Sequence, residues 1–316
     1  MSRGAPGTRQ ARVRALAKLN LDLRVLGKRP DGYHELRTVF QTISLADALE
    51  IAFTPGRKTV VELEDPLGIE NNLAARAATL ILHMMRASGR AQIRLVKHIP
   101  IGAGLGGGSS DAAAVLLALP VLAGRVMPLT KLLAAALELG SDVPFFLLGG
   151  TAAAIGRGGE LFPLPDLPPQ PGLLVAPGVH ISTAQAYRDL SPRLTSESQQ
   201  NKIFTFHSLL WDGGVSKGVC NDFEAVVFSA HPELARLKKR LIRAGAFPVL
   251  MSGSGSAIFG LFRTGEEVRN ALSELEGERA FPISLVNRRR YRLMWWRALQ
   301  EHIDQKIWPP RSRYVR

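Results

Sequence analysis

The sequence contains a single cysteine, and this scarcity is the first constraint on the protein. Cys220 has no partner in the chain, so an internal disulfide is excluded and a reducing, cytoplasmic location is expected. Long apolar runs are missing as well, because none reaches the ~18 residues that a membrane-spanning helix requires. The basic N-terminus lacks the unbroken apolar segment of a secretory signal peptide. We therefore expect no contact with a membrane.

Acidic residues are scarce at both ends of the chain. The net charge is +13, which invites a nucleic-acid-binding interpretation. Residues 1–18 carry five Lys or Arg and no acid, and residues 286–316 carry a net charge of +7, so the residues between them are almost neutral. Charge clusters at chain ends are usually solvated. We therefore do not expect a nucleic-acid partner on the basis of the net charge.

The length and composition are those of a globular, two-domain protein. The chain has 316 residues, 46% of them hydrophobic. The stretch "PLPDLPPQPG", residues 163–172, holds five prolines and is the best candidate for a link between domains. Strand and helix patterns are mixed without strict alternation or segregation, which predicts an α+β fold.

The linker and the two basic ends divide the chain into four predicted segments. We predict a basic leader over residues 1–14, an N-terminal domain over 15–164, a C-terminal domain over 165–285 and a basic, aromatic extension over 286–316. The extension, "NRRRYRLMWWRALQEHIDQKIW", could bind nucleic acid or an anionic lipid surface through its mixed cations and aromatics. The alternative, which we favour, is an extra helix that packs Trp295, Trp296 and Leu299 onto the body of the protein or a partner.

Hydrophobic periodicity places the first elements. Apolar and polar residues alternate over 19–25, which predicts a half-buried strand, and residues 38–45 and 47–53 have the pattern of two further strands. "NNLAARAATLILHMMRAS", residues 71–88, predicts a helix with an Asn cap. Residues 109–124 predict a buried helix that contains a proline near its end.

A glycine-rich loop joins a strand pattern to that buried helix. In "PIGAGLGGGSSDAA", residues 100–113, five glycines occupy the seven positions 102–108. A flexible linker would be flanked by polar sequence, which this loop is not. Gly102, Gly104 and Gly107 satisfy the dinucleotide-binding pattern, but residues 118–130 hold no acid for a ribose hydroxyl. A Walker loop is excluded too, because no lysine directly precedes the serines.

Physical chemistry suggests what such a loop does. Glycines let backbone N–H groups approach a ligand closely, and a helix that begins near Ser109 or Ser110 favours an anion at its N-terminus. The loop is therefore predicted to cradle a polyphosphate through its backbone. Asp111 complicates this prediction, because a carboxylate repels phosphate unless it faces away or holds Mg²⁺.

The same stretch resembles the phosphate loop of the GHMP kinases, a superfamily of two-domain α+β small-molecule kinases. "AKLNL" near the N-terminus and "MSGSGSAIFGLF" in the second half resemble two further motifs of the superfamily. "AKLNLDLRVLGKRPDGYHELRTVFQTISLAD", "GSDVPFFLLGGTAAAIGRGG", "APGVHISTAQAY" and "NDFE" resemble one family within it, the 4-diphosphocytidyl-2-C-methyl-D-erythritol kinases. Ser141 stands where that family has Ala. The resemblance covers residues 15–285 and leaves both ends outside it.

The resemblance implies an activity. Enzymes of this family use ATP to phosphorylate the 2-hydroxyl of CDP-methylerythritol in the non-mevalonate route to isoprenoid precursors. ATP, Mg²⁺ and a small-molecule substrate are then expected, and the sequence leaves a monomer and a homodimer open. The alternatives are another GHMP kinase of the homoserine or mevalonate type, or a nucleic-acid-binding protein that uses the basic termini.

The resemblance also assigns roles to individual residues. Asp142 would accept or orient the proton of the attacking hydroxyl, and Lys18 would pair with it and stabilise the transferred phosphoryl group. From the pattern alone, Lys18 is a surface lysine and Asp142 a turn residue. Asn20 shares a strand face with Lys18 and could bind the substrate.

Binding residues follow in the same way. Tyr33, His34 and Tyr187 would hold the cytidine, with the two tyrosines as the faces of a sandwich and His34 selecting the base edge; otherwise they are ordinary surface or helix residues. Gly253 would contact the substrate, or simply form a tight turn. The residues expected to bind ATP are Asn72, Pro100, Ile101, Gly102, Ala103, Gly104, Leu105, Gly106, Gly107, Gly108, Ser109 and Ser110.

Overall fold

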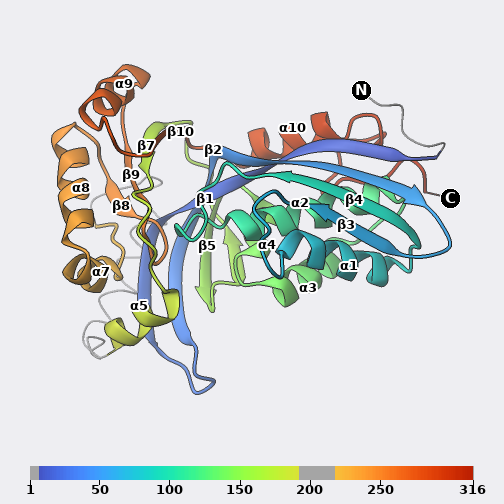
Figure 1. Ribbon diagram of the computed structural model, residues 1–316, viewed down its shortest axis with the longest axis horizontal. Helices are drawn as coiled ribbons and strands as arrows, with labels where there is room; N and C mark the ends of the chain where they lie inside the picture. Colours follow the sequence, from blue (N-terminus) through green and yellow to red (C-terminus); the bar gives the residue numbers. More distant parts are fainter. Residues whose placement is uncertain (1–6, 192–217, 316) are drawn as a thin grey trace.

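The N-terminal half of the protein is built on one large sheet. The computed structural model describes residues 7–191 and 218–315 (Figure 1). Its first two strands, β1 (Arg9–Lys28) and β2 (His34–Pro55), pair antiparallel along their whole length. The remaining strands extend this sheet in the order β3-β4-β2-β5-β6. They are β3 (Val60–Glu64), β4 (Gly89–Val96), β5 (Thr151–Gly156) and β6 (Glu160–Pro163).

Two predictions about these strands were wrong. Residues 38–45 and 47–53 form one continuous strand, β2, rather than two. The segment from Ala15 to Leu23 is buried on both faces instead of one. The reason is the second domain, whose core packs Leu23 and Val25, while Leu16 packs into the core of the first domain. β1 is therefore shared by both domains.

Four helices form the second layer of this domain (Figure 1). They are α1 (Leu73–Met85), α2 (Gly107–Leu122), α3 (Leu129–Leu139) and α4 (Val143–Leu148). The predicted cap is confirmed, because Asn72 Oδ1 accepts the N–H of Ala74 at 2.9 Å. α2 is the central helix, buried from Ser110 to Leu122 and packed on β1, β2 and the other three helices.

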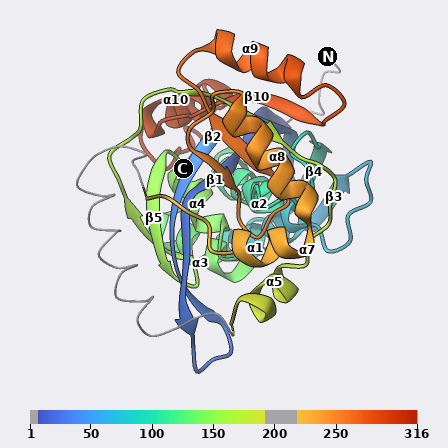
Figure 2. The same cartoon turned by 90° about the vertical axis from the view of Figure 1, so that its left-hand side faces the viewer.

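The second domain is a smaller sheet with helices on its outer side. Its strands run in the order β10-β7-β9-β8, and Figure 2 shows α7, α8 and α9 on its outer side. The strands are β7 (Pro171–Val175), β8 (Val249–Met251), β9 (Ile258–Leu261) and β10 (Ala280–Ser284). The helices are α5 (Thr183–Leu190), α7 (Glu224–Ala230), α8 (Pro232–Arg243) and α9 (Gly265–Glu274). Together the two sheets give the predicted α+β class.

The chain then returns to the first domain. Helix α10 (Arg288–Ala298) lies along β1, and Tyr291, Trp295 and Leu299 enter the core of the N-terminal domain. This confirms the preferred interpretation of the extension as a packed helix, with Trp296 partly buried against the same core. The predicted leader boundary between residues 14 and 15 falls inside a strand, because β1 begins at Arg9.

Candidate functional site

The glycine-rich loop connects β4 to α2 and has the backbone that its glycines allow. The φ angle is +69° at Gly102, +78° at Gly104 and +69° at Gly106, a region that favours glycine. Helix α2 begins at Gly107, two residues before the predicted start at Ser109. No side chain caps this helix. The first N–H groups of any helix lack intrahelical partners, and here no capping side chain replaces them at the end of the loop.

A second glycine-rich loop, residues 251–256, packs directly on the first. Ser252 Oγ donates to the carbonyl of Gly104 at 3.0 Å, and the N–H of Ala257 donates to the carbonyl of Ala103 at 3.3 Å. A Cβ on Gly104 would lie 2.0 Å from the carbonyl oxygen of Ser252, so only glycine fits there. Gly253, with φ +59°, sits against Gly104. The second loop thus backs the first.

Asn221 fixes the second loop, and sequence analysis did not single it out. Its Nδ2 donates to the carbonyls of Met251 and Gly253, both at 2.7 Å, while its Oδ1 accepts the N–H of Phe223. This residue begins "NDFE", one of the segments that carried the family resemblance, which was the available signal.

Two cavities meet at the glycine loop. The larger has a volume of about 830 Å³ and the smaller about 390 Å³. Gly104, Gly106 and Ser109 line both of them. A group bound on the loop is therefore within reach of both cavities, which is the arrangement needed to pass a group from one ligand to another.

The smaller cavity contains almost all of the predicted ATP-binding residues. It is lined by Asn72, Lys97, Asp111 and every loop residue from Pro100 to Ser109. Ser110 is absent from the lining, because its hydroxyl donates to the Leu16 carbonyl at 2.7 Å and its side chain is buried. Asn72 uses its amide to cap α1 and to donate to Asp65 at 3.0 Å. Its contact with adenosine stays a prediction.

Asp111 does not face the loop as a free carboxylate. The Lys97 ammonium lies between Asp47 and Asp111, with Nζ 2.5 Å from Asp47 Oδ2 and 2.7 Å from Asp111 Oδ2. Asp47 also accepts the N–H groups of His98 and Ile99. The pKa of Asp111 is raised to about 7. Burial makes the largest contribution, Lys97 acts in the opposite direction, and the Asp47 carboxylate adds to the increase. This ion triad joins the end of β4 to the first turns of α2.

Lys18 and Asp142 lie together in the larger cavity, as predicted. Lys18 Nζ is 3.5 Å from Asp142 Oδ2. The lysine is 4% exposed rather than a surface residue, and its backbone N–H donates to the Leu105 carbonyl at 3.0 Å. Burial is the largest influence on the pKa of Lys18 and lowers it, while the charge and hydrogen bond of Asp142 act in the opposite direction.

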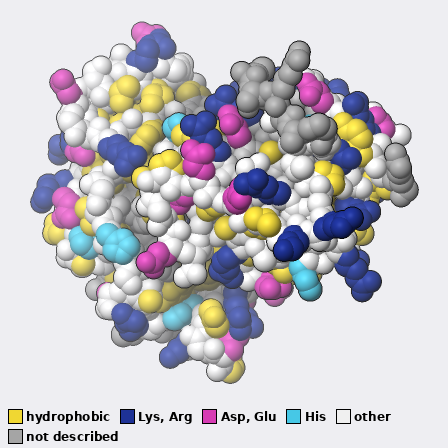
Figure 3. All heavy atoms as spheres, turned by 45° about the vertical axis from the view of Figure 1, so that its right-hand side comes forward, with side chains coloured by type: hydrophobic (Ala, Val, Ile, Leu, Met, Phe, Trp, Pro, Cys, Tyr) yellow, Lys and Arg dark blue, Asp and Glu magenta, His cyan; other side chains and the backbone are white. Residues whose placement is uncertain are grey.

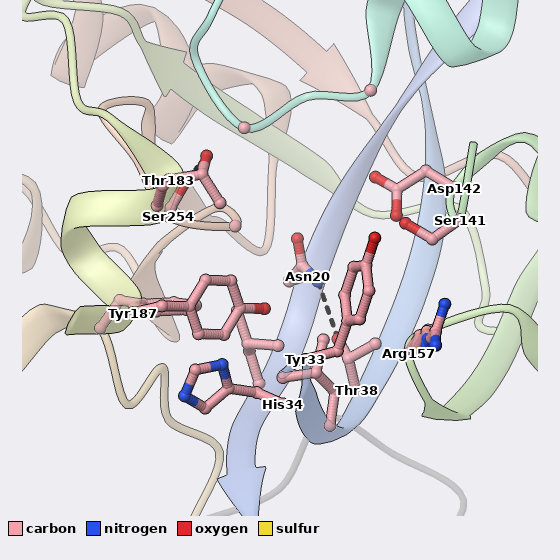
Figure 4. A pocket seen from close by; sticks show the side chains of 18 of the residues that line it. Asn20, Tyr33, His34, Thr38, Ser141, Asp142, Arg157, Thr183, Tyr187 and Ser254 are labelled. Carbon is pink, nitrogen blue, oxygen red and sulfur yellow. Dashed lines mark hydrogen bonds between the residues drawn. The ribbon is translucent and has the colours of Figure 1, made fainter. Parts of the chain in front are cut away.

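A short hydrogen-bond chain holds the Lys18 side chain. Lys18 Nζ donates to Asn20 Oδ1 at 2.7 Å, and Asn20 Nδ2 donates to Thr38 Oγ1 at 2.8 Å. Thr38 in turn donates to the Asp22 carbonyl at 2.6 Å. This hydrogen-bond chain fixes the orientation of the Asn20 amide. Figure 4 shows its bond between Asn20 and Thr38 as a dashed line. Thr38 was missed by sequence analysis, because a threonine in a strand carries no signal of its own.

The aromatic side chains that are expected to hold the cytidine stand at the far end of the same cavity. Tyr33 is 58% exposed on the turn between β1 and β2, and Tyr187 comes from α5 on the other side (Figure 4). The His34 ring stacks on Tyr187, with centroids 4.6 Å apart and planes inclined by 18°. The Arg157 guanidinium lies 3.9 Å from the centre of the Tyr33 ring, a contact that the sequence did not suggest.

A protein oxygen for a magnesium ion is present at the junction of the cavities. Among the described residues no three His, Cys, Asp or Glu side chains form a group that could hold a metal ion. Mg²⁺ in kinases, however, typically takes one or two protein oxygens plus phosphate oxygens and water. The Ser109 hydroxyl lines both cavities beside the loop and fits this requirement.

Family models match both domains. The family model of the GHMP kinase N-terminal domain matches residues 72–150, and the model of the GHMP kinase C-terminal domain matches residues 210–279. Within the described residues no helix is both long and apolar enough to cross a membrane.

Individual relatives show which family within the GHMP kinases the chain resembles most. A 4-diphosphocytidyl-2-C-methyl-D-erythritol kinase of Solibacter usitatus is 64% identical over 311 residues, 97% of this chain and 98% of the relative. One from Pelobacter propionicus is 41% identical over 83% of this chain and 93% of its own length. A crystal structure of 4-(cytidine 5'-diphospho)-2C-methyl-D-erythritol kinase, 40% identical, covers 87% of this chain and 98% of its own with a TM-score of 0.74.

A more distant structure shows how widely the fold is shared. A homoserine kinase from Cytophaga hutchinsonii is 18% identical, covers 91% of this chain and 98% of its own, and has a TM-score of 0.68, a likeness of fold alone. With two GHMP domains and a near full-length relative at 64% identity, this chain belongs to the GHMP kinases and, within them, to the 4-diphosphocytidyl-2-C-methyl-D-erythritol kinase family.

Proposed function

We propose that this chain transfers the γ-phosphoryl group of ATP to the 2-hydroxyl of 4-diphosphocytidyl-2-C-methyl-D-erythritol. One observation carries the proposal: the cavity that holds Lys18 and Asp142 meets the smaller cavity at Gly104, Gly106 and Ser109. The smaller cavity then takes the nucleotide and the larger one takes the acceptor. The phosphoryl group crosses between them at the N-terminus of α2.

The loop binds phosphate through its backbone. The first N–H groups of α2 lack intrahelical partners, and the helix dipole favours negative charge at that end. Lys97 is engaged by Asp47 and Asp111, so it holds the loop in place and leaves the phosphates to the backbone. Mg²⁺, which we also propose, would be held by Ser109 and the phosphates, and would neutralise charge that develops on the phosphoryl oxygens.

Lys18 and Asp142 act on the acceptor hydroxyl. Asp142 accepts or orients the hydroxyl proton, because its side chain lines the cavity and is 32% exposed. Lys18 keeps Asp142 ionised and places a positive charge next to the reacting oxygens. Phosphoryl transfer has a loose transition state, so positioning and charge contribute more than strong deprotonation.

The aromatic end of the larger cavity fits the cytosine base. His34 stacks on Tyr187, whose ring also makes a T-shaped contact with Phe223. Arg157 covers one face of Tyr33, so the other face of Tyr33 is the one we expect a base to use. Stacking on an aromatic side chain contributes about 1–3 kcal/mol per base. The sandwich of Tyr33 and Tyr187 stays a proposal on this basis, as does substrate contact by Asn20 and Gly253.

Nucleic-acid binding by the basic termini is not favoured. Tyr291 and Trp295 of the extension are buried in the core and are unavailable for base stacking. On the face seen in Figure 3, Lys and Arg side chains are spread out with Asp and Glu between them. The cytoplasmic location stays a prediction.

An acceptor panel tests the proposed function. ATP turnover with Mg²⁺ is measured against CDP-methylerythritol, homoserine and mevalonate, with phosphoryl transfer followed in each product. We expect turnover of the CDP compound alone. Turnover of another acceptor would leave the fold and loop assignments intact but overturn the roles of Tyr33, His34 and Tyr187.

A further inference from the structure

Asp142 owes its position to a very short helix. It is the residue before α4 (Val143–Leu148), and its side chain makes no capping bond to that helix. Its carboxylate therefore pairs with Lys18 and not with the helix, and its location depends on where the α4 backbone lies. An isolated helix of six residues is not stable in water, so contacts from elsewhere must hold it.

α2 and α3 pack against α4, and the C-terminal extension supplies hydrogen bonds to its C-terminal end. A helix leaves its last carbonyls without intrahelical donors. In α4 the Phe146 carbonyl accepts a hydrogen bond from Tyr291 Oη, and the Leu147 carbonyl accepts one from Trp308 Nε1 at 3.0 Å. Just beyond the helix, the Gly149 carbonyl accepts one from Arg288 Nε at 3.2 Å.

The turn after α4 is shaped to admit these side chains. Gly149 and Gly150 have φ angles of +66° and +75°. A Cβ on Gly149 would lie 2.3 Å from the Tyr291 ring, and one on Gly150 would lie 2.7 Å from Arg288 Cβ. The two glycines thus let the extension approach the backbone of α4 directly.

The donors themselves are held firmly. Tyr291 is 1% exposed and lies in the core of the N-terminal domain. The Arg288 guanidinium also donates to the carbonyls of Leu164 and Thr151, and its backbone N–H donates to Asp166. The extension is therefore a rigid support under α4.

We propose that Tyr291 and Trp308, with Arg288, are positioning residues for the phosphoryl-transfer reaction: they hold the C-terminal end of α4 so that Asp142 stays 3.5 Å from Lys18. This inference rests on the proposed function, because it gives the extension a part in that same site. Phe146 follows Asp142 by four positions, about one helical turn. A displacement of about 1 Å at a reacting group can cost about 10²-fold in rate.

The test removes two donors without removing the rings. Tyr291→Phe deletes the hydroxyl and Trp308→Phe deletes the indole N–H. We expect the double variant to lose about tenfold in kcat with both KM values within twofold of the parent. Trp296→Phe is the matched control, because Trp296 Nε1 donates to the Ile307 carbonyl, within the extension itself. It should keep the kcat of the parent.

Hydrogen exchange gives a readout that does not depend on the reaction. Amides of residues 143–150 should exchange faster in the double variant and at the parental rate in Trp296→Phe. Exchange that is equally slow in all three proteins would overturn the support of α4, whatever the acceptor proves to be. Failure of the parent protein to phosphorylate any acceptor would instead overturn the proposed function.

A double-mutant cycle assigns the effect to Asp142. In an Asp142→Asn background, the two substitutions should cause no further loss of kcat, because the residue they position no longer acts. An equal tenfold loss in that background would show that the extension acts elsewhere and would overturn the proposal. So would a double variant with the kcat of the parent and merely a lower melting temperature.

Discussion

The imidazole of His34 stacks on the ring of Tyr187, and this contact joins the turn after β1 to helix α5 across the acceptor cavity. His34 Nε2 also lies 2.9 Å from Ser191 Oγ, whose own proton is donated to the Tyr187 carbonyl. Ser191 must therefore accept from His34, which places the proton on Nε2. Burial lowers the pKa of His34, and Lys28 adds to the decrease, so the ring is neutral near pH 7.

Base selection by His34 is the first prediction. The neutral tautomer leaves Nδ1 as an acceptor, which suits the exocyclic amino group of cytosine and not the carbonyl of uracil. His34→Phe keeps a stacking ring but loses the acceptor. We expect KM for the CDP acceptor to rise by about 2–12-fold, the equivalent of one hydrogen bond. Preference over the UDP analogue should fall by a similar factor, and undiminished preference would contradict the assignment.

Stacking by Tyr33 is the second prediction. Tyr33→Ala removes an exposed ring at the end of the acceptor cavity. If the ring stacks on cytosine, kcat/KM for the acceptor should fall by about 5–150-fold, which corresponds to ~1–3 kcal/mol. Tyr33→Phe should retain most of the activity, and KM for ATP should not change in either variant. An equal loss in the Phe and Ala variants would assign the effect to the hydroxyl instead.

Loss of turnover without loss of binding is the third prediction. Asp142→Asn should lower kcat by about 10²–10⁴-fold, the range for a general base, while calorimetry shows both substrates binding within a few-fold of the parent. Because Asp142 raises the pKa of Lys18, its removal lets burial lower that pKa further. The residual activity should therefore decline at a lower pH on the alkaline side. A near-normal kcat would remove Asp142 from the mechanism.

Two glycines of the same loop should respond in opposite ways, and this is the fourth prediction. Gly104→Ala places a Cβ 2.0 Å from the Ser252 carbonyl at a φ of +78°, so the melting temperature should fall by several degrees. Gly108 lies in α2, where a Cβ would meet Leu73 Cδ1 at an ordinary 3.7 Å. Gly108→Ala should keep or raise the melting temperature, because alanine favours a helix by about 0.5–1 kcal/mol. Equal destabilisation by both would contradict the docking of the two loops.

Local patterns in the sequence were enough to predict the local parts of this site. The glycine loop, the Asn72 cap and the strand that carries Lys18 and Asn20 each depend on neighbouring residues, and all were found. The family resemblance added Asp142, which looks from its surroundings like a turn residue. α4 itself was missed, because six residues are too few to show a helical period.

Contacts between distant segments could not be predicted from the sequence. Lys97 was not identified because its partner Asp47 is fifty residues away, and Asp47 itself shows no motif. The double-sided burial of β1 depends on a domain that follows more than a hundred residues later. Tyr291 is 145 residues from the carbonyl that it binds, so its link to Asp142 appears only in the folded chain.

The ion triad gives the last prediction, a pH dependence of stability. The pKa of Asp111 is about 7 in the folded protein and 3.8 as an ordinary aspartate. The folded state therefore holds this proton more tightly, and the resulting stability is fully present below pH 3.8 and is lost as the pH rises through about 7. Asp111→Asn does not titrate and lacks this dependence.

Chemical denaturation between pH 4 and 8 measures the difference. The free energy of unfolding of the parent, taken relative to Asp111→Asn at each pH, should decrease toward pH 7 by at most ~1.4 kcal/mol per pH unit, the limit for one proton. Above pH 7 the difference should become constant, because Asp111 is then ionised in both states. Lys97→Met is the matched control: without the ammonium, two buried carboxylates face each other, so the pKa of Asp111 rises and the decrease continues to higher pH. A difference that does not change with pH would show that Asp111 is already ionised at pH 4 and that Lys97 outweighs both burial and Asp47.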